Sequence, residues 1–597
     1  MPEYNAPLRD TKFVMQELLN CNEHYQHLGY QDATPDMLDA ILSEAAKFSE
    51  NVIAPINASG DKEGCRWENG TVTTPTGFKE AYQQYVEGGW PTLTHRTEFG
   101  GQGLPYSLNS HVTEILSAAN NSFSIYPVLS HGASATIEAH GTQEQQAMFM
   151  PKIVEGTWTG TMCLTEPQCG TDLGLLRTKA ELNEDGTYAI TGTKIFISGG
   201  EQDLSENIIH IVIARIPGSP EGTRGISLFA VPKFNISAAG DIEEKNNVSC
   251  GSIEHKMGIH ANATCVMNFD GAKGYLIGTV NKGLSCMFTF MNAARLNVAN
   301  EGVASADASF QGALAYAKDR LQMRSLSGVK NPDGPADAII VHPDVRRMLL
   351  TQKSIAEGGR ALVGYLSQLV DSTHAEKNPE IKAISESKLS LLTPIAKAFL
   401  TELGFEATSH GVQVFGGHGF IQEWGMEQLM RDARISMLYE GTTGIQALDL
   451  LARKVLGTKG EIMKPFANEV AEFCQQNSTT PEMLAFINPI IKYTDEWQSL
   501  TQSIGKKAIA NPDEVGAASV DYLMYSGYVV LAYFWAKMAK VSLDKIAEGS
   551  DDAFYHAKLK TAKFYFDRML PRALGHAACL QTGGESMMAL NEDEFTF

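Results

Sequence analysis

The hydrophobic pattern of residues 34 to about 156 has the spacing of α-helices. Apolar residues recur three and four positions apart, as at Met37 and Ile41. Thr34 followed by Pro35 is typical of a helix start, because threonine caps the first turn and proline suits the first helical position. The pattern predicts a helical domain with loops.

Residues 157 to about 278 have a different pattern, with short runs rich in β-branched residues. One run, at 188–191, follows an Asp-Gly pair at 185–186, and further runs lie at 208–216 and 226–231. An Asp-Gly pair between such runs is a hairpin signal. This block is expected to be mostly antiparallel β-strand.

Helical spacing returns at residue 283 and continues to about 456, with a helix start predicted at 342–344, His-Pro-Asp. A final stretch, 464–597, has helix-breaking residues near 477–481 and then further helical segments. Because strands and helices do not alternate regularly, the order excludes a doubly wound sheet. The sequence predicts a mainly α fold with a central β domain.

The chain is too long for a single core, since domains commonly hold about 100 to 200 residues. We divide its 597 residues into five segments. These are an N-terminal extension (1–33), an N-terminal helical domain (34–160), a middle β domain (161–280), a helical bundle (281–458) and an additional C-terminal helical domain (459–597).

The chain is acidic, with 48 Lys and Arg against 69 Asp and Glu and a formal net charge of −21. Such a field repels phosphate backbones and anionic membranes, so an anionic ligand must be met by locally placed cations or helix N-termini. Nucleic acid is therefore not expected as a partner.

The nine cysteines are an odd number and form no Cys-x-x-Cys pair. They do not combine with histidines at metal-ligand spacing either. We expect reduced thiols, no metal site and a cytoplasmic location.

Two segments bear on export and membranes. The first twenty residues mix charged and apolar positions and lack the pattern of a secretory signal. The apolar segment 525–541 is shorter than the roughly 20 residues that span a bilayer, and it contains Lys537 and Lys540. We expect a buried or interface helix there and no integral membrane segment.

The commonest nucleotide, zinc and serine-nucleophile motifs are absent. The glycine pairs at 101–103 and 417–419 lack the third glycine of a dinucleotide fingerprint, and no Walker loop, His-Glu-x-x-His or Gly-x-Ser-x-Gly occurs. A nicotinamide-binding domain is therefore not supported.

Three segments together resemble the signatures of the acyl-CoA dehydrogenase family. They are CLTEPQCGTD at 163–172, QVFGGHGF at 413–420 and RDARISMLYEGTTGIQ at 431–446. The resemblance covers about 34–456, and the opening at 4–8 and the extra C-terminal domain are similar to the long bacterial subgroup that includes methylmercaptopropionyl-CoA dehydrogenases. It implies a β-barrel-like middle domain between an N-terminal helical domain and a C-terminal four-helix bundle.

The same resemblance implies FAD as the cofactor. Leu164 and Thr165 would then face the flavin, Phe196 would pack on its isoalloxazine ring, and Ser198 would hydrogen-bond to it. The other cofactor contacts that it implies are Arg320, Gln413, Gly416, Gly417, Thr442 and Gly444.

The segment 317–324 resembles the helix end whose arginine pairs with the flavin pyrophosphate across a dimer interface. Here Met323 stands where the family usually has phenylalanine, and both Arg320 and Arg324 are candidates. A guanidinium suits pyrophosphate because its planar fork makes two charge-assisted bonds. Gln413 would reach the cofactor from the partner subunit, which implies a homodimer.

Glu440 is the candidate catalytic base that the resemblance implies, taking the α-proton of an acyl thioester while a hydride leaves the β-carbon for the flavin. Such a proton is too weakly acidic to be lost to a carboxylate in water, so the site must change both pKa values. Some relatives carry the base just before the arginine matched by Arg295, but this chain has Ala294 there. The substrate contacts that the resemblance implies are Thr171, Asn292, Arg295 and Gly441.

The resemblance thus implies dehydrogenation of an acyl-CoA to trans-2-enoyl-CoA, with electron-transfer flavoprotein as the electron acceptor. The substrate would be a medium- or long-chain fatty acyl-CoA or 3-methylmercaptopropionyl-CoA. An acyl-CoA oxidase that uses oxygen is one alternative. A DNA-binding flavoprotein of the same fold is another, but residues 460–597 hold 12 Lys and Arg against 18 Asp and Glu.

Overall fold

The computed structural model describes residues 3–237 and 240–597. The chain divides into two compact units, each described here by itself. The first unit holds residues 32–297 with 4–6, and the second holds residues 298–597 with 7–31. The boundary between them falls within helix α9 (Gly283–Asp319).

The first unit begins with helices, as the sequence predicts. Helix α3 (Pro35–Phe48) is capped by Thr34, whose hydroxyl accepts a hydrogen bond from the backbone N–H of Met37, which confirms the predicted helix start. A small hairpin, β1 (Arg66–Glu68) and β2 (Thr71–Thr73), was not predicted. The other helices are α4 (Asn57–Glu63), α5 (Phe78–Glu87), α6 (Tyr106–Ala119), α7 (Asn121–His140) and α8 (Gln143–Glu155).

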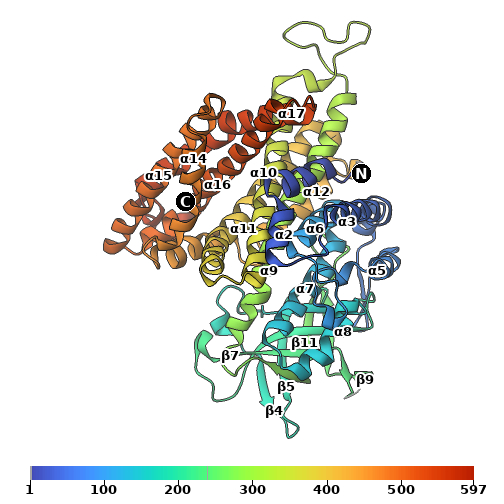
Figure 1. Ribbon diagram of the computed structural model, residues 1–597. Coiled ribbons are helices and arrows are strands. Elements are labelled where there is room, and N and C mark those ends of the chain that lie inside the picture. Colours follow the sequence, from blue (N-terminus) through green and yellow to red (C-terminus); the bar gives the residue numbers. More distant parts are fainter. Residues whose placement is uncertain (1–2, 238–239) are drawn as a thin grey trace. The chain divides into compact units, whose positions relative to one another are not determined.

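A seven-stranded sheet lies at one end of this unit, beside α7 and α8 (Figure 1). Its strands are β3 (Trp158–Cys163), β4 (Lys179–Leu182), β5 (Tyr188–Ser198), β6 (Asn207–Arg215), β7 (Ile226–Pro232), β10 (Val248–Ile253) and β11 (Thr264–Ile277). A separate hairpin pairs β8 (Phe234–Ile236) with β9 (Ile242–Lys245).

The strand pairings return on themselves. β11 pairs with β5, β5 with β4, β4 with β6, β6 with β7, and β7 again with β11. Such a circuit leaves few unpaired edges. The pairs are mostly antiparallel, as predicted, but β3 and β4 run parallel to β6, which the sequence did not indicate. The mainly α fold with a barrel-like central β domain is confirmed.

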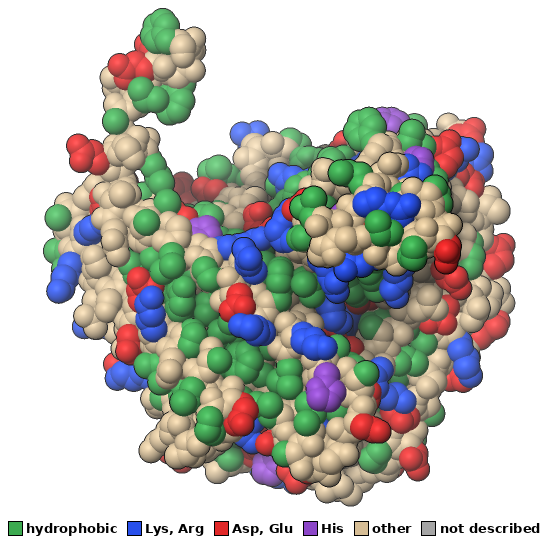
Figure 2. Space-filling model, turned by 90° about the horizontal axis from the view of Figure 1, so that it is seen from above, with side chains coloured by type: hydrophobic (Ala, Val, Ile, Leu, Met, Phe, Trp, Pro, Cys, Tyr) green, Lys and Arg blue, Asp and Glu red, His purple; other side chains and the backbone are tan. Residues whose placement is uncertain are grey.

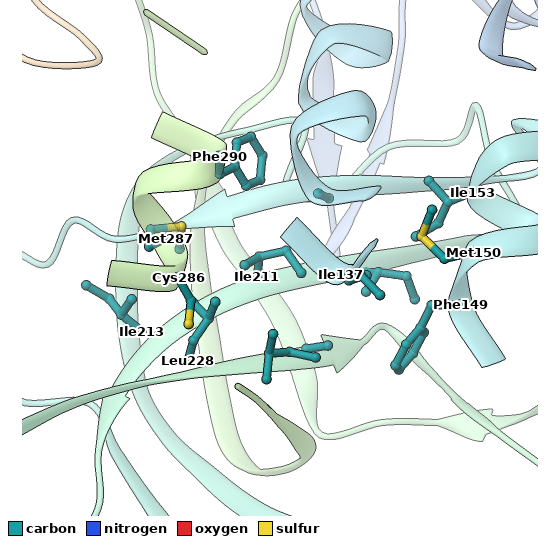
Figure 3. Packing of buried hydrophobic residues seen from close by; sticks show 14 of the residues in the cluster. Ile137, Phe149, Met150, Ile153, Ile211, Ile213, Leu228, Cys286, Met287 and Phe290 are labelled. Carbon is teal, nitrogen blue, oxygen red and sulfur yellow. The ribbon is translucent and has the colours of Figure 1, made fainter. Parts of the chain in front are cut away.

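One hydrophobic core lies between the sheet and the helices that cover it (Figure 3). Ile137 of α7 and Phe149 of α8 face Ile211 of β6, and Phe290 comes from the start of α9. The alternate residues of β6, such as Val212, belong to a second core on the other side of the strand. Because β6 is buried on both faces, its sequence is an unbroken apolar run rather than an alternating one.

Long antiparallel helices form the second unit. α10 (Pro343–Ala375) and α11 (Pro379–Phe415) lie side by side (Figure 1). The short helix α13 (Thr443–Leu448) packs against α11. α9 and α11 approach closely, since a Cβ on Gly302 would lie 2.4 Å from the Leu400 carbonyl oxygen. The remaining helices are α1 (Leu8–Lys12), α2 (Cys21–Leu28), α12 (Met426–Ala433), α14 (Lys464–Asn477), α15 (Leu484–Ala510), α16 (Asp513–Ala547), α17 (Ala553–Phe564), α18 (Ala573–Thr582) and α19 (Glu585–Met588).

The apolar segment at 525–541 is part of the 35-residue helix α16, and most of its residues are buried, which confirms the expected buried helix. Among the described residues α16 is the one helix long and apolar enough to cross a membrane. However, 67% of its most apolar window is buried inside the protein, as in the core helix of many folds. The Trp535 indole on α16 donates to the Ser354 carbonyl oxygen of α10 at 3.1 Å, and Gly527 packs against Phe399 of α11.

Within the second unit, a buried ion cluster ties the N-terminal helix α1 to α10 and α17. Asp10 pairs with both Arg360 and Lys558, which in turn pair with Asp307 at 3.3 Å and Glu357 at 2.8 Å. Burial alone would raise the pKa of Asp10, but the two cations outweigh it and lower that pKa to about 2. Asp10 therefore stays charged, and its charge holds residues 7–31 against the helices.

Candidate functional site

Glu440 lies in a tight turn before α13, with an unusual backbone. Its φ is +55°, in the left-handed region that glutamate rarely adopts, and that of Gly441 is +91°. A Cβ on Gly441 would lie 2.4 Å from the Gln446 side-chain nitrogen, so only glycine fits. Strained backbone of this kind persists only where its surroundings enforce it.

Two buried polar side chains, Lys397 and Gln446, hold this turn through hydrogen bonds. The ammonium of Lys397, fully buried on α11, donates to the carbonyl oxygens of Ser436 at 2.8 Å and Gly441 at 2.7 Å. Gln446 donates to the carbonyl oxygen of Glu440 at 3.0 Å. The carbonyl oxygens of this turn thus point toward buried donors, which fixes the backbone from which the half-buried Glu440 side chain extends.

Thr442 and Gly444 have local roles as well. Thr442 caps α13, where its hydroxyl accepts from the backbone N–H of Ile445 at 3.3 Å. Thr443 donates to Glu402 of α11 at 2.6 Å. Open space surrounds the missing side chain of Gly444, with no atom closer than 4.0 Å.

A second carboxyl, Glu301 of α9, lies close to Glu440. It is 6% exposed and accepts a hydrogen bond from the hydroxyl of Tyr439. Burial raises its pKa to about 7, the nearby charge of Glu440 adds to that rise, and the Tyr439 hydrogen bond and Lys397 oppose it. Glu301 is therefore close to the midpoint of its titration near neutral pH.

Sequence reasoning missed both Lys397 and Glu301. Each is a charged residue inside an apolar helical run, Pro-Ile-Ala-Lys-Ala-Phe at 394–399 and Val-Ala-Asn-Glu-Gly-Val at 298–303. A buried ionisable group of this kind is a functional candidate. That interruption of the run is the signal that could have identified them.

The two arginines proposed for pyrophosphate, Arg320 and Arg324, differ in how many partners their guanidinium groups have within the chain. Arg324 donates to the carbonyl oxygens of Asn331 at 2.7 Å and Gly334 at 2.6 Å and pairs with Asp337 at 3.3 Å. It is thereby committed to the loop that follows α9. Arg320 is exposed, and its guanidinium makes no ion pair with the described part of the chain, so it is the better candidate.

The end of α9 and the glycine turn after α11 are brought together. Tyr316, one helical turn before Arg320, stacks on Phe415 with ring centroids 4.1 Å apart, and its hydroxyl is 2.9 Å from His418 Nδ1. The turn contains three predicted contact residues, Gln413, Gly416 and Gly417, and all three are exposed. No atom lies within 4 Å of a Cβ built on Gly416 or on Gly417.

Exposed apolar side chains flank this turn and the loop after α9. Phe420 is 84% and Leu326 is 96% exposed, and Met323 and Ile421 are exposed as well. Exposed apolar side chains often mark a surface that is covered by a partner.

In the first unit, the loop 164–171 is held by a buried carboxylate. Glu166 accepts from Lys194 at 2.9 Å and from the backbone N–H groups of Arg177 and Thr178 at 2.7 and 3.0 Å. Burial would raise the pKa of Glu166, but Lys194 and these donors lower it to about 2. The glutamate of this motif is thus a structural anchor for the loop.

Phe196 and Ser198 lie on β5, next to that loop. The backbone N–H of Ile195 donates to the Thr165 carbonyl oxygen at 2.9 Å, which brings Thr165 beside the strand. Phe196 has a φ of +60° and leaves its ring 58% exposed, an arrangement that costs free energy without a partner for the ring.

Several predicted contact groups of the first unit remain available. No hydrogen bond to the described part of the chain engages the hydroxyls of Thr165, Thr171 or Ser198. Arg295 of α9 is buried, and its guanidinium donates to the exposed Asn292 at 3.4 Å, a long contact that orients it. Leu164 is half-buried, and its carbonyl oxygen accepts from Lys194 at 3.0 Å.

Local positive charge exists despite the acidic composition. Figure 2 shows Lys and Arg side chains among hydrophobic and acidic ones on the face that it draws. An anionic ligand on a chain of net charge −21 needs such locally placed cations. Within residues 3–237 and 240–597, no group of three or more His, Cys, Asp or Glu could hold a metal ion.

Four family models match the chain in order. They describe the acyl-CoA dehydrogenase N-terminal domain (35–157), its middle domain (161–272), its C-terminal domain (281–456) and an acetyl-CoA dehydrogenase C-terminal-like domain (466–591). Together they account for most of the chain and confirm the family that the motifs indicated.

Known relatives agree. The chain is 40% identical to the 3-methylmercaptopropionyl-CoA dehydrogenase of Ruegeria pomeroyi, over 98% of this chain and 99% of the relative. It is 33% identical to a broad-specificity linear acyl-CoA dehydrogenase of Mycobacterium tuberculosis, over 100% of both. The solved acyl-CoA dehydrogenase of Bacillus anthracis complexed with FAD has the same fold, with a TM-score of 0.74 at 21% identity over 95% of this chain and 90% of that one. The chain therefore belongs to the acyl-CoA dehydrogenase family, whose members are FAD-dependent oxidoreductases that act on CH–CH bonds.

Proposed function

We propose that this chain dehydrogenates an acyl-CoA between its α- and β-carbons, with Glu440 as the base that removes the α-proton. The observation that carries this proposal is the turn that holds Glu440. Glu440 has a left-handed backbone conformation, and the buried Lys397 anchors the neighbouring Gly441. Backbone strain of this kind is typical of functional sites.

The residues present fit FAD. Phe196 offers an exposed ring for a flat aromatic ligand, and the unengaged hydroxyls of Thr165 and Ser198 offer hydrogen bonds to its edge. Arg320 offers an uncommitted guanidinium for a pyrophosphate, and the open glycine turn at 416–417 lets the backbone approach a bulky group. Gln413, Thr442 and Gly444 complete the proposed cofactor contacts.

The chain's own residues supply binding, orientation and proton transfer. FAD, when bound, supplies the acceptor for the hydride that leaves the β-carbon. The Glu440 carboxylate takes the α-proton, and the fixed turn limits the directions in which that carboxylate can point. Thr171, Asn292, Arg295 and Gly441 are the residues that we propose for contact with the acyl-CoA.

Glu301 is a positioning residue that tunes the base. Its carboxyl is bonded to Tyr439, the neighbour of Glu440 in the chain. When Glu301 loses its proton, a second negative charge appears near Glu440 and strengthens it as a base.

For the substrate we propose 3-methylmercaptopropionyl-CoA, because the relative that acts on it is 40% identical over nearly the whole chain. A linear fatty acyl-CoA is the second candidate, favoured by the broad-specificity relative at 33% identity. The acyl pocket sets this choice through its depth and shape.

For the partners we propose electron-transfer flavoprotein as electron acceptor and a homodimer as assembly. The exposed apolar side chains beside Gln413, such as Phe420, suit a surface covered by a second copy. In that dimer Gln413 would contact the cofactor of the partner subunit.

Replacing Glu440 by glutamine should abolish the reaction and leave the cofactor in place. Glu440→Gln keeps the size of the side chain but removes the base, so the rate of flavin bleaching by saturating acyl-CoA should fall by about 10²–10⁴-fold. Stopped-flow absorbance measures this rate. Glu402→Gln, which alters the carboxylate bonded to Thr443, is the matched control and should lose far less. Unchanged bleaching in Glu440→Gln would overturn the assignment.

The pH dependence should reveal Glu301. Since its pKa is raised to about 7, its ionisation above that pH should increase the rate constant of flavin reduction as the base becomes stronger. In Glu301→Gln this step near pH 7 should vanish, while FAD content and KM change little. Stopped-flow rates across neutral pH test this. Persistence of the same step in the variant would show that another group titrates.

A panel of acyl-CoAs should separate the substrates and the two enzyme classes. We expect the highest kcat/KM with 3-methylmercaptopropionyl-CoA and lower values with linear acyl-CoAs of increasing length. After reduction, the flavin should reoxidise slowly in air and rapidly with electron-transfer flavoprotein. Fast peroxide formation in air would instead identify an oxidase, and equal kcat/KM across the panel would reject the preferred substrate.

A further inference from the structure

A small cavity of about 40 Å³ lies within the first unit, between α5, α6, α7 and α8, and α9 contributes Asn297 to its wall. This volume admits a few heavy atoms, because one water molecule needs about 10–15 Å³. It is far below the roughly 300 Å³ at which sites for whole small molecules begin. The cavity therefore suits the end of a ligand rather than a complete one.

Aromatic rings and neutral polar groups share the cavity wall. Tyr82, Tyr85 and Trp90 supply three of the rings, and no Asp, Glu, Lys or Arg is among the described residues that line it. Burial lowers the pKa of His95, which also lines the cavity, to about 3, so this imidazole is uncharged near neutral pH. Because a charged group would find no counter-charge here, the ligand end that fits must be neutral.

Most buried polar groups of the wall are engaged within the protein. The Tyr82 hydroxyl donates to the carbonyl oxygen of Gly156 at 2.9 Å. The Ser130 hydroxyl donates to the carbonyl oxygen of Tyr126 at 3.1 Å. By contrast, Asn297 is 7% exposed, and its side-chain amide makes no hydrogen bond with the part of the chain that the structure describes. A buried amide without an acceptor is unfavourable, so an acceptor on the ligand would stabilise it.

Asn297 lies on the face of α9 that also carries Glu301. The two residues are four positions apart on one helix, so their side chains leave the same face about 6 Å apart along the axis. Glu301 is the carboxyl whose pKa is raised in part by the charge of Glu440. An acyl group whose α-carbon lies at Glu440 can therefore extend along this face of α9 toward Asn297.

We propose that this cavity receives the methylthio end of the acyl group, with the sulfur accepting a hydrogen bond from the Asn297 amide and the methyl group against the rings of Tyr85 and Trp90. A thioether sulfur is a weak acceptor, and it makes favourable contacts with aromatic rings at about 5 Å. A methylene in its place would leave the amide unpaired. The inference rests on the proposed function, and it makes Asn297 the residue that selects a thioether over an alkyl chain of equal length.

Pentanoyl-CoA is the matched probe, because it has a methylene where 3-methylmercaptopropionyl-CoA has sulfur. With the FAD-loaded enzyme we expect kcat/KM to be about fivefold higher for the thioether, since only the thioether gives the amide an acceptor. Asn297→Leu keeps the size of the side chain but removes the donor, so the two kcat/KM values should agree within about twofold. Asn297→Ala, which a helix accommodates well, repeats the test if the leucine variant is unstable.

Binding without turnover gives a second readout. Calorimetric titration of FAD-loaded Glu440→Gln should show the same preference for the thioether, and the double variant Glu440→Gln with Asn297→Leu should lose it. Thr136→Val is the control, because it removes a buried hydroxyl of α7 that lies outside the cavity and is bonded to the Gly132 carbonyl oxygen at 2.8 Å. This control should keep the preference of the unmodified chain.

Trp90→Leu tests the wall separately. Removing the indole should lengthen the cavity, so kcat/KM for octanoyl-CoA should rise about tenfold or more relative to that for pentanoyl-CoA. An unchanged ratio would contradict the placement of the acyl end in this cavity.

Two further results would overturn the inference and leave the proposed dehydrogenation intact. They are equal kcat/KM for the two acyl-CoAs in the unmodified enzyme, and an unchanged preference for the thioether in Asn297→Leu and Asn297→Ala. Absence of flavin reduction by either acyl-CoA would instead overturn the proposed function, and this inference with it.

Discussion

The buried ammonium of Lys397 is the interaction on which the proposed active site depends. It holds the carbonyl oxygens on both sides of Glu440, at Ser436 and Gly441, within 2.8 Å. A buried ammonium without such acceptors would cost several kcal/mol, so the lysine and the turn enforce each other. The strained φ of Glu440 is sustained by this arrangement, which leaves the carboxylate little freedom to point elsewhere.

The same principle recurs through the acidic chain: buried charges are placed in pairs that fix a segment. Glu166 and Lys194 hold the loop of the first motif. Asp10 with its two cations holds the N-terminal helix. Glu301 is buried as well, but Lys397 and the Tyr439 hydrogen bond do not outweigh its burial, and its pKa rises to about 7. The pKa values of Glu166 and Asp10 are thus lowered, whereas the pKa of the carboxyl beside the proposed base is raised.

Local sequence signals predicted local structure well. The Thr34-Pro35 helix start, the hairpin at Asp185-Gly186 and the start of α10 at Pro343 appear as expected, because caps and turns depend on a few adjacent residues. The parallel pairing of β3 with β6 and the full length of α16 were not predicted, since both depend on distant partners. The five segment boundaries stay a prediction.

The site shows the same division. Motifs located Glu440 and the flavin loop residues, whose assigned roles stay proposals. The structure adds that the Arg324 guanidinium is already engaged by its own loop, whereas that of Arg320 makes no ion pair with the described residues. Lys397 and Glu301 could not be found from motifs, because their importance comes from burial against a turn far away in the chain. Residues that act through packing leave only a weak trace in sequence.

The most direct test of this account is the rate of flavin reduction in Lys397→Met, measured in FAD-loaded enzyme with saturating acyl-CoA. The substitution keeps the length and burial of the side chain but removes the ammonium, so the Glu440 turn should lose its anchor. Lys388→Met on the same helix is the control, since Lys388 pairs with Glu469 away from the turn. We predict a fall of about 10²-fold in Lys397→Met with FAD retained, because small misplacement of a base has that effect. A rate within twofold of the unmodified enzyme would contradict the account.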